Sequence, residues 1–307
     1  MVDVFAIIEV AVYIALVSPI TYILLKHGRK GILGWLALQS FCFTRIIGNI
    51  LVLKDGDNST AATIINSIGL SPLLIGTIGI IHEARSARHP KLHRGREWCF
   101  VLNFHTMITV AMVLVVMGVI HMIDKTQTKT SENLMKLGMI ITVFCYGQCW
   151  LYVGLSFLPS QVEPSAPALA EGLTLLYGVI AALPFIGIRQ VYGLKIFIDD
   201  LNNEGNSKFA TSKPAKYLLS AIPEFLAICI FCFVGIRTRH LSKLVKGSKY
   251  TVVEGVGQGY QGPNDDRLPL QYMPPQQGEG KYEPYKQPYP NQGPKEEYSP
   301  QVQQPVY

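Results

Sequence analysis

The stretch LGWLALQSFCFTRIIGNILVL, residues 33–53, is long enough and apolar enough to cross a lipid bilayer. A hydrocarbon core of about 30 Å requires roughly 20 consecutive apolar residues in an α-helix. The same stretch contains Arg45. A guanidinium at the bilayer centre costs about 2.5–3.5 kcal/mol even on the most lenient insertion scale. A span that keeps such a residue needs a partner or a function for it.

Similar apolar runs recur along the first 240 residues of the 307-residue chain. Hydrophobic residues make up 49% of the chain and charged residues 16%, and the mean hydropathy is +0.26. This composition excludes an ordinary soluble domain and indicates a polytopic membrane protein. The formal net charge of +6 does not indicate a nucleic-acid partner, because the basic residues lie in short segments beside apolar runs, where they determine topology.

The predicted fold is an all-α bundle of seven transmembrane helices. The expected spans are about residues 4–25, 32–53, 61–82, 98–122, 134–157, 169–188 and 217–236.

Basic residues cluster after the first, third and last expected spans, in KHGRKG (26–31), HEARSARHPKLHRGRE (82–97) and RTRHLSKLVKGSK (237–249). Seven spans place these segments on one side, and positive residues mark the cytoplasmic side. The second connection contains the sequon Asn58-Ser59-Thr60, whose glycosylation requires the opposite side. The N-terminus is therefore expected outside and the C-terminus inside, with Arg85–Arg96 forming a basic cytoplasmic loop.

The C-terminal segment has a different composition from the rest of the chain. We predict a transmembrane domain over residues 1–246 and a disordered cytoplasmic tail over residues 247–307, which is rich in Pro, Gln, Gly and Tyr and poor in aliphatic residues. Its tyrosines suggest docking to a cytoplasmic partner or phosphorylation. A tail that is merely solvated is the simpler interpretation.

Polar residues from different spans share one expected depth. Glu9, Arg45, Asn66 and Glu224 each lie five to eight residues below the outer end of their span, roughly 7–12 Å deep. Arg189 is expected where the sixth span meets the outer surface. We interpret this layer as the lining of an outward-facing polar cavity that binds a small ligand or a lipid headgroup. A structural ion pair without a ligand is the alternative, and Arg45 could pair with Glu224 or with Glu9.

Two prolines lie inside the expected spans. Pro72 in the third span and Pro184 in the sixth remove backbone hydrogen bonds and are candidate hinges. The glycines around Pro72 equally suit close helix packing.

The sequence predicts neither a metal site nor a cofactor. His105 and His121 lie sixteen residues apart on one expected helix, too far to share an ion. The six cysteines lie in or beside apolar runs, where packing is the simpler interpretation than metal or redox chemistry. Because no nucleophile–base arrangement is visible either, we do not expect an enzyme.

Several motifs together resemble a known family. They are HGRKGILGW (27–35), RIIGNIL (45–51), INSIGLSPLLIGTIGII (65–81), ALPFIGIRQVYG (182–193) and IPEFLAI (222–228). In this combination the chain resembles an uncharacterised fungal family of seven-span membrane proteins, a domain of unknown function, over about residues 4–240. The residues that match its pattern are Arg45, Gly48, Asn66, Gly69, Ser71, Pro72, Pro184, Phe185, Arg189 and Glu224. The resemblance implies a seven-span fold and a fungal membrane, but no activity. More distantly, the layout is similar to fungal seven-span receptors and lipid-translocating exporters.

The leading functional hypothesis is a receptor-like or sensor-like protein of the plasma membrane or an endomembrane. Its ligand would enter the polar layer, and its basic loop and tail would face cytoplasmic partners. The runner-up is a transporter or lipid exporter that uses Arg45 and Glu224 for an anionic substrate or a proton.

Overall fold

The computed structural model describes most of the chain outside the C-terminal tail. The described residues are 4–28, 31–56, 60–89, 94–123, 128–159, 162–203 and 212–245. The chain divides into two units, Met1–Gly259 and Tyr260–Tyr307, and every described residue belongs to the first. Asn58 and the tail lie outside the described residues, so the predictions made for them stay predictions.

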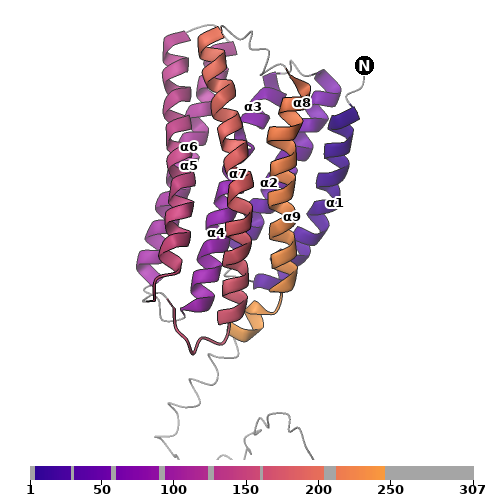
Figure 1. The fold of residues 1–307 in the computed structure, drawn as a ribbon. Coiled ribbons are helices and arrows are strands. Elements are labelled where there is room, and N and C mark those ends of the chain that lie inside the picture. Colours follow the sequence, from indigo (N-terminus) through magenta and orange to yellow (C-terminus); the bar gives the residue numbers. More distant parts are fainter. Residues whose placement is uncertain are drawn as a thin grey trace, which may run out of the picture. The chain divides into compact units, whose positions relative to one another are not determined.

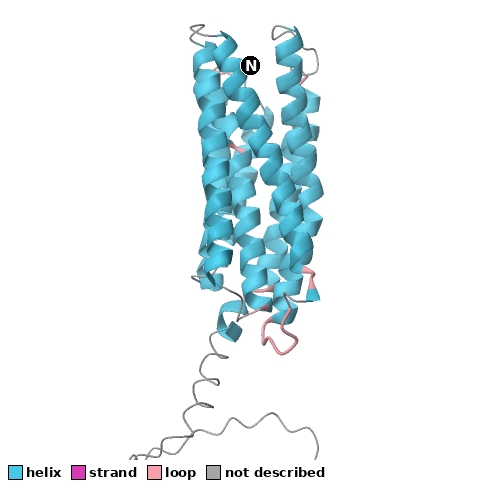
Figure 2. Cartoon of the chain, turned by 90° about the vertical axis from the view of Figure 1, so that its left-hand side faces the viewer, coloured by secondary structure: helices cyan, strands magenta, loops and turns pink. Residues whose placement is uncertain are grey.

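Every regular element within these ranges is a helix (Figure 1). The order is α1 (Val4–His27), α2 (Ile32–Asp55), α3 (Thr60–Ile68), α4 (Leu70–Arg88), α5 (Arg94–Ile123), α6 (Thr128–Ser156), α7 (Leu169–Asn203), α8 (Lys213–Lys216), the π-helical turn η3 (Tyr217–Ala221) and α9 (Ile222–Arg237). The long helices run side by side along one direction (Figure 2). We call the end at which α1 begins the upper end and the end at which α1 finishes the lower end.

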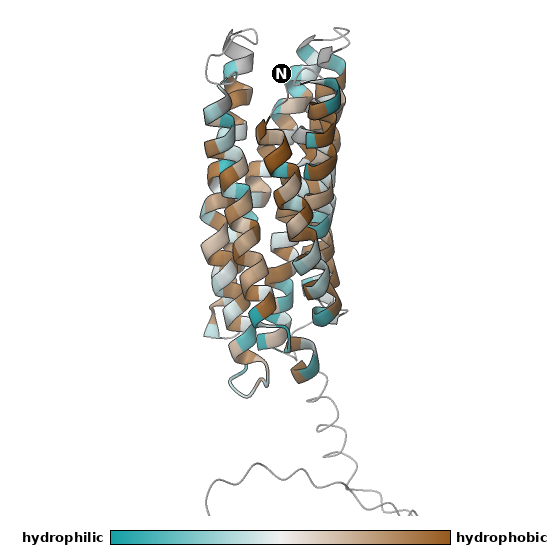
Figure 3. Ribbon diagram, turned by 90° about the vertical axis from the view of Figure 1, so that its right-hand side faces the viewer, coloured by the Kyte–Doolittle hydropathy of each residue, from teal (hydrophilic) through white to brown (hydrophobic). Residues whose placement is uncertain are grey.

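Six of the described helices are long and apolar enough to cross a membrane: Val4–His27, Ile32–Asp55, Gly95–His121, Lys129–Ser156, Leu169–Asp199 and Pro214–Arg237. They correspond to six of the seven predicted spans. Hydrophobic residues predominate along these helices (Figure 3), and many large apolar side chains are exposed, among them Leu25, Val191 and Phe233. Because such surfaces are stable only against hydrocarbon, the chain is a multi-pass membrane protein.

The third predicted span, residues 61–82, corresponds to two helices, α3 and α4, that meet at Gly69. Gly69 keeps helical backbone dihedrals (φ −52°, ψ −31°), so only the helical hydrogen-bond pattern is interrupted there. Pro72 explains the position, because a proline has no N–H and its ring collides with the carbonyl four residues earlier, which belongs to Ile68, the last residue of α3. Pro72 itself lies in the first turn of α4, where its missing N–H is tolerated.

The helix that contains the sixth predicted span, residues 169–188, is longer than that span. Helix α7 continues to Asn203 and contains 35 residues. At 1.5 Å per residue it is about 52 Å long, well beyond a hydrocarbon core of about 30 Å. Arg189 consequently lies near the middle of a helix, and α7 continues beyond the predicted span.

Helix α4 forms the centre of the bundle and packs against α2, α5, α6 and α7. Its contact with α2 depends on two glycines, because a Cβ added to Gly79 would lie 2.5 Å from the Cα of Gly34. The two backbones therefore approach each other as closely as in small-residue motifs of membrane helices. Leu73, Leu74, Ile78, Ile80 and Ile81 are fully buried around this contact.

Candidate functional site

The upper half of the bundle contains a buried ionic triad made by Arg45 of α2, Glu224 of α9 and Arg189 of α7. Arg45 Nη2 donates a short hydrogen bond to Glu224 Oε1, and Arg189 Nε donates to the same oxygen at 2.6 Å. Glu224 is 1% exposed and Arg45 7%. The open question of the Arg45 partner is thus answered: it is Glu224, and Arg189 joins the pair.

Local structure holds Arg45 in this position. Its guanidinium carbon lies 5.5 Å from the centre of the Phe41 ring, one turn below on the same helix. On the other side lies Gly69, at the break between α3 and α4, where an added Cβ would come within 3.0 Å of Nη2. A side chain at position 69 would therefore displace the guanidinium. The missing side chain of Gly69 therefore makes room for the charge.

Glu9 belongs to the same region but not to the triad. Its Oε2 accepts a hydrogen bond of 2.8 Å from Asn49 Nδ2, and the same amide donates to the Arg45 carbonyl at 3.0 Å. Asn49 therefore connects the Glu9 carboxylate to the helix turn that carries Arg45. Sequence reasoning did not single out Asn49, although it lies four residues after Arg45 and thus on the same helical face.

The triad is incompletely satisfied within the described part of the chain. Arg45 Nε, Glu224 Oε2 and the Tyr13 hydroxyl are buried there without a hydrogen-bond partner. Two guanidinium groups face one triad carboxylate, so the triad has a formal charge of +1. Buried polar atoms without partners destabilise a structure by about 1–3 kcal/mol each. Three such atoms therefore lie buried in the same region of the bundle.

The remaining residues of the predicted site take different places. Asn66 lies on α3, and its side chain is outside the described part of the structure. Pro184 lies inside the continuous helix α7, five residues before Arg189. The Tyr146 hydroxyl of α6 donates to the carbonyl of Leu183 at 3.1 Å beside this proline. The hinge role of Pro72 and Pro184 stays a prediction.

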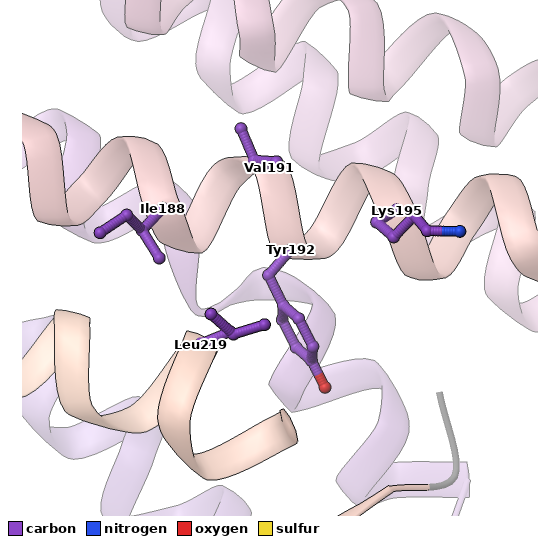
Figure 4. Close-up of a pocket in the computed structure, with 5 residues that line it drawn as sticks. All are labelled: Ile188, Val191, Tyr192, Lys195 and Leu219. Carbon is purple, nitrogen blue, oxygen red and sulfur yellow. The ribbon is translucent and has the colours of Figure 1, made fainter. Parts of the chain in front are cut away.

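The structure contains a cavity close to Arg189, but it is not the predicted cavity lined by Arg45, Glu224, Glu9 and Asn66. The observed cavity, of about 300 Å³, is lined by Ile188, Val191, Tyr192, Lys195 and Leu219 (Figure 4). None of the charged residues of the predicted site is among them. It opens between α7 and η3, on the exposed side of α7, and its wall residue Tyr192 has its ring centre 6.0 Å from the Arg189 guanidinium carbon.

A second buried polar cluster, which sequence reasoning missed, lies at the lower end. His27 Nε2 donates to the Gly235 carbonyl at 2.9 Å, and His27 Nδ1 lies 2.8 Å from Glu83 Oε1. Trp35 Nε1 donates to the other Glu83 oxygen at 3.0 Å. His27 and Glu83 are each 1% exposed. This cluster joins α1, α2, α4 and α9.

The neighbouring face of α4 carries a third polar cluster. Arg85 donates from Nη2 to Glu97 Oε1 at 2.7 Å and from Nε to Glu97 Oε2 at 3.2 Å, a bidentate pair. Tyr152 donates a short hydrogen bond to the same carboxylate, and Arg85 Nη1 donates to the Ser156 hydroxyl at 3.1 Å. The cluster therefore connects α4, α5 and α6.

These contacts correct the predicted basic loop. Arg85 and Arg88 are buried in the last turns of α4, and Arg88 Nη1 donates to the Ser156 carbonyl at 2.8 Å. Neither guanidinium is available to a cytoplasmic partner. The sequence does contain a signal for the longer helix, because the first strong stop after Gly79 is Pro90, which predicts a helix end at about residue 89.

The fold and these clusters define the class of the protein, which is a polytopic helical bundle with buried ion pairs. Comparison with known proteins then gives its family. Residues 1–241 match the family model DUF7702, a domain of unknown function, and the chain belongs to that family. No curated protein and no solved structure matches the chain.

Proposed function

We propose that this protein is a receptor-like or sensor-like membrane protein that binds a small anionic group at the Arg45–Glu224–Arg189 triad. The observation that carries the proposal is the sharing of one Glu224 oxygen by two guanidinium groups, beside buried atoms that lack partners. An incoming carboxylate or phosphate would give Arg45 a second acceptor and neutralise the excess positive charge. Guanidinium groups match both kinds of anion well because their donors form a planar fork.

The proposed topology has seven crossings, with α3 and α4 together as the third. The N-terminus lies outside and the C-terminus inside, so the triad lies in the outer half. The sequence supports this orientation through the basic segments at residues 26–31 and 237–249. Loss of a glycosidase-sensitive mass in Asn58→Gln would support it, whereas a glycosidase-resistant wild-type protein would count against it.

The proposal includes the location of the protein and the role of its C-terminal tail. The setting is a fungal plasma membrane or endomembrane, which rests on the sequence resemblance alone. The tail of residues 247–307 faces the cytoplasm and serves as the docking segment for a cytoplasmic partner. The protein binds rather than catalyses.

Binding can be tested with minimal anions. We expect acetate or phosphate, titrated into purified protein in neutral detergent, to raise the thermal unfolding temperature. A ligand at 100 times its Kd stabilises a folded protein by about 2.7 kcal/mol. The effect should be lost in Arg45→Gln and Arg189→Gln, and kept in Arg239→Gln, whose side chain is exposed. Equal shifts in all four proteins would show that the triad is only a structural ion pair.

A transporter or lipid exporter is the second candidate, and helix geometry favours it. The helical hydrogen-bond pattern is interrupted at Gly69 beside Arg45, and the π-helical turn η3 ends three residues before Glu224. Interrupted helices often surround transporter binding sites, and π-helical turns often mark functional positions. Flux of an anion into proteoliposomes that follows a pH or substrate gradient would favour transport. Binding without flux would favour the receptor.

A further inference from the structure

The cavity between α7 and η3 is a groove on the outside of the bundle. Tyr192 and Leu219 face each other across it, one from α7 and one from η3 (Figure 4). Ile188 and Val191 form its lower part and are exposed, as expected for side chains that face hydrocarbon. Its volume of about 300 Å³ is at the lower limit of ordinary ligand sites, about 300–1,000 Å³. The groove therefore suits a slender apolar segment.

Polarity changes along the groove in one direction. Lys195 lies seven residues after Ile188 on α7, which is about 10 Å along the helix axis toward the upper end of the bundle. The lower part is apolar, and Lys195 lies at the top with its side chain 55% exposed. Lys195 Nζ lies 2.5 Å from Asp199 Oδ1, one turn higher, which holds the ammonium near the helix. A membrane lipid has the same order, with its acyl chain deep and its phosphate at the surface.

We propose that this groove is a binding site for one glycerophospholipid of the leaflet at the upper end, with an acyl chain between Tyr192 and Leu219 and the phosphate against Lys195. An ammonium has three N–H donors, so Lys195 can keep its contact with Asp199 and also donate to the phosphate, which lysine binds without a fixed geometry. This site is separate from the triad, and it stands whether or not the triad binds an anion.

The groove differs from ordinary lipid-facing surface because its walls are held in place. Tyr192 is only 5% exposed, and its ring is fixed beside the Arg189 guanidinium. Leu219 belongs to the π-helical turn, whose extra residue per turn displaces the backbone from regular helical packing. The acyl chain would thus contact a tyrosine ring that the protein holds in a defined place.

The acyl-chain part of the proposal can be tested with a matched pair of variants in the same turn. Leu219→Trp fills the groove, whereas Leu218→Trp adds the same indole at a side chain that is 62% exposed. Delipidated protein is titrated with dioleoyl phosphatidylcholine and followed by native mass spectrometry. We expect Leu219→Trp to weaken binding at least tenfold and Leu218→Trp to leave it unchanged. Equal binding by the two variants would overturn the proposal.

The phosphate contact has its own control. Lys195→Gln should weaken phosphatidylcholine binding about fivefold, the equivalent of ~1 kcal/mol for one lysine near a membrane surface. Binding of dioleoylglycerol, which has the same chains and no phosphate, should not change. Lys136→Gln is the control, because Lys136 also belongs to an i,i+4 pair, with Glu132 on α6. If Leu219→Trp does not fold, this comparison decides alone: an unchanged ratio of the two lipids in Lys195→Gln refutes the site.

Discussion

Replacement of Glu224 by glutamine is expected to destabilise the bundle more than replacement of Arg45, although the two residues are partners. Glu224→Gln leaves two guanidinium groups, Arg45 and Arg189, without a counter-charge in the triad. Removal of one partner of a buried pair costs about 3–5 kcal/mol. Arg45→Gln leaves Glu224 with its 2.6 Å bond to Arg189. Only one charged hydrogen bond is then lost, worth about 1.5–3 kcal/mol.

The double variant Arg45→Gln/Glu224→Gln measures the coupling between the two residues. It leaves one unpaired guanidinium, that of Arg189, rather than two. Its loss of unfolding free energy should therefore be close to that of Glu224→Gln alone, about 3–5 kcal/mol, and not the sum of the two single losses. The coupling between the two sites is the difference between that sum and the double-variant value.

The measurement is reversible unfolding of purified protein in mixed micelles of increasing SDS content, followed by circular dichroism. Arg239→Gln is the control for loss of an exposed arginine. Strict additivity of the single effects would refute the ion pair. A larger loss for Arg45→Gln than for Glu224→Gln would refute the role given to Arg189.

Three further predictions concern the rest of the bundle. Gly79→Ala should lower the free energy of unfolding by about 1–3 kcal/mol, because its Cβ would lie 2.5 Å from the backbone of α2, whereas Gly147→Ala, with open space around its Cβ, should not. Glu83→Ala should lose about 3–5 kcal/mol, because it removes the acceptor of a buried indole and the partner of a buried imidazole; a loss below 1 kcal/mol would contradict this. Tyr152→Phe should lose about 1.5–3 kcal/mol through its hydrogen bond to the Glu97 carboxylate, and equal melting curves would show that this bond is unimportant.

The membrane spans were the part of the fold most open to prediction, because hydrocarbon thickness determines how long an apolar run must be. The expected start of the second span, residue 32, is the first residue of α2. The length of a helix beyond the hydrocarbon is not determined by that thickness, so α7 continues to Asn203 through polar residues such as Asp199 and Asp200.

The lower-end clusters could not be predicted from charge rules. Arg85 and Arg88 look like topogenic residues, because the positive-inside rule treats arginines after an apolar run as loop residues. Their burial depends on Glu97 and Ser156, which belong to other helices. Sequence shows how deep a residue lies along its helix, but not which face meets which neighbour.

The same limit applies to the upper site. Depth correctly placed Arg45 and Glu224 in one layer, and the structure shows that they touch. Depth did not distinguish Glu224 from Glu9 as the partner. It also placed Arg189 nearer the surface than Glu224, whereas the two side chains are in contact. Whether the layer binds a ligand is a question for the anion titration.

Helix α4 shows what the centre of this bundle depends on. It is the central helix, yet it is not among the described helices apolar enough to cross a membrane alone. Its lower part carries Glu83, Arg85 and Arg88, whose partners come from the surrounding helices: His27 of α1, Glu97 of α5 and Ser156 of α6. Burial of these three charges is therefore a property of the assembled bundle and not of the α4 sequence, so α4 is the helix that the others hold in place.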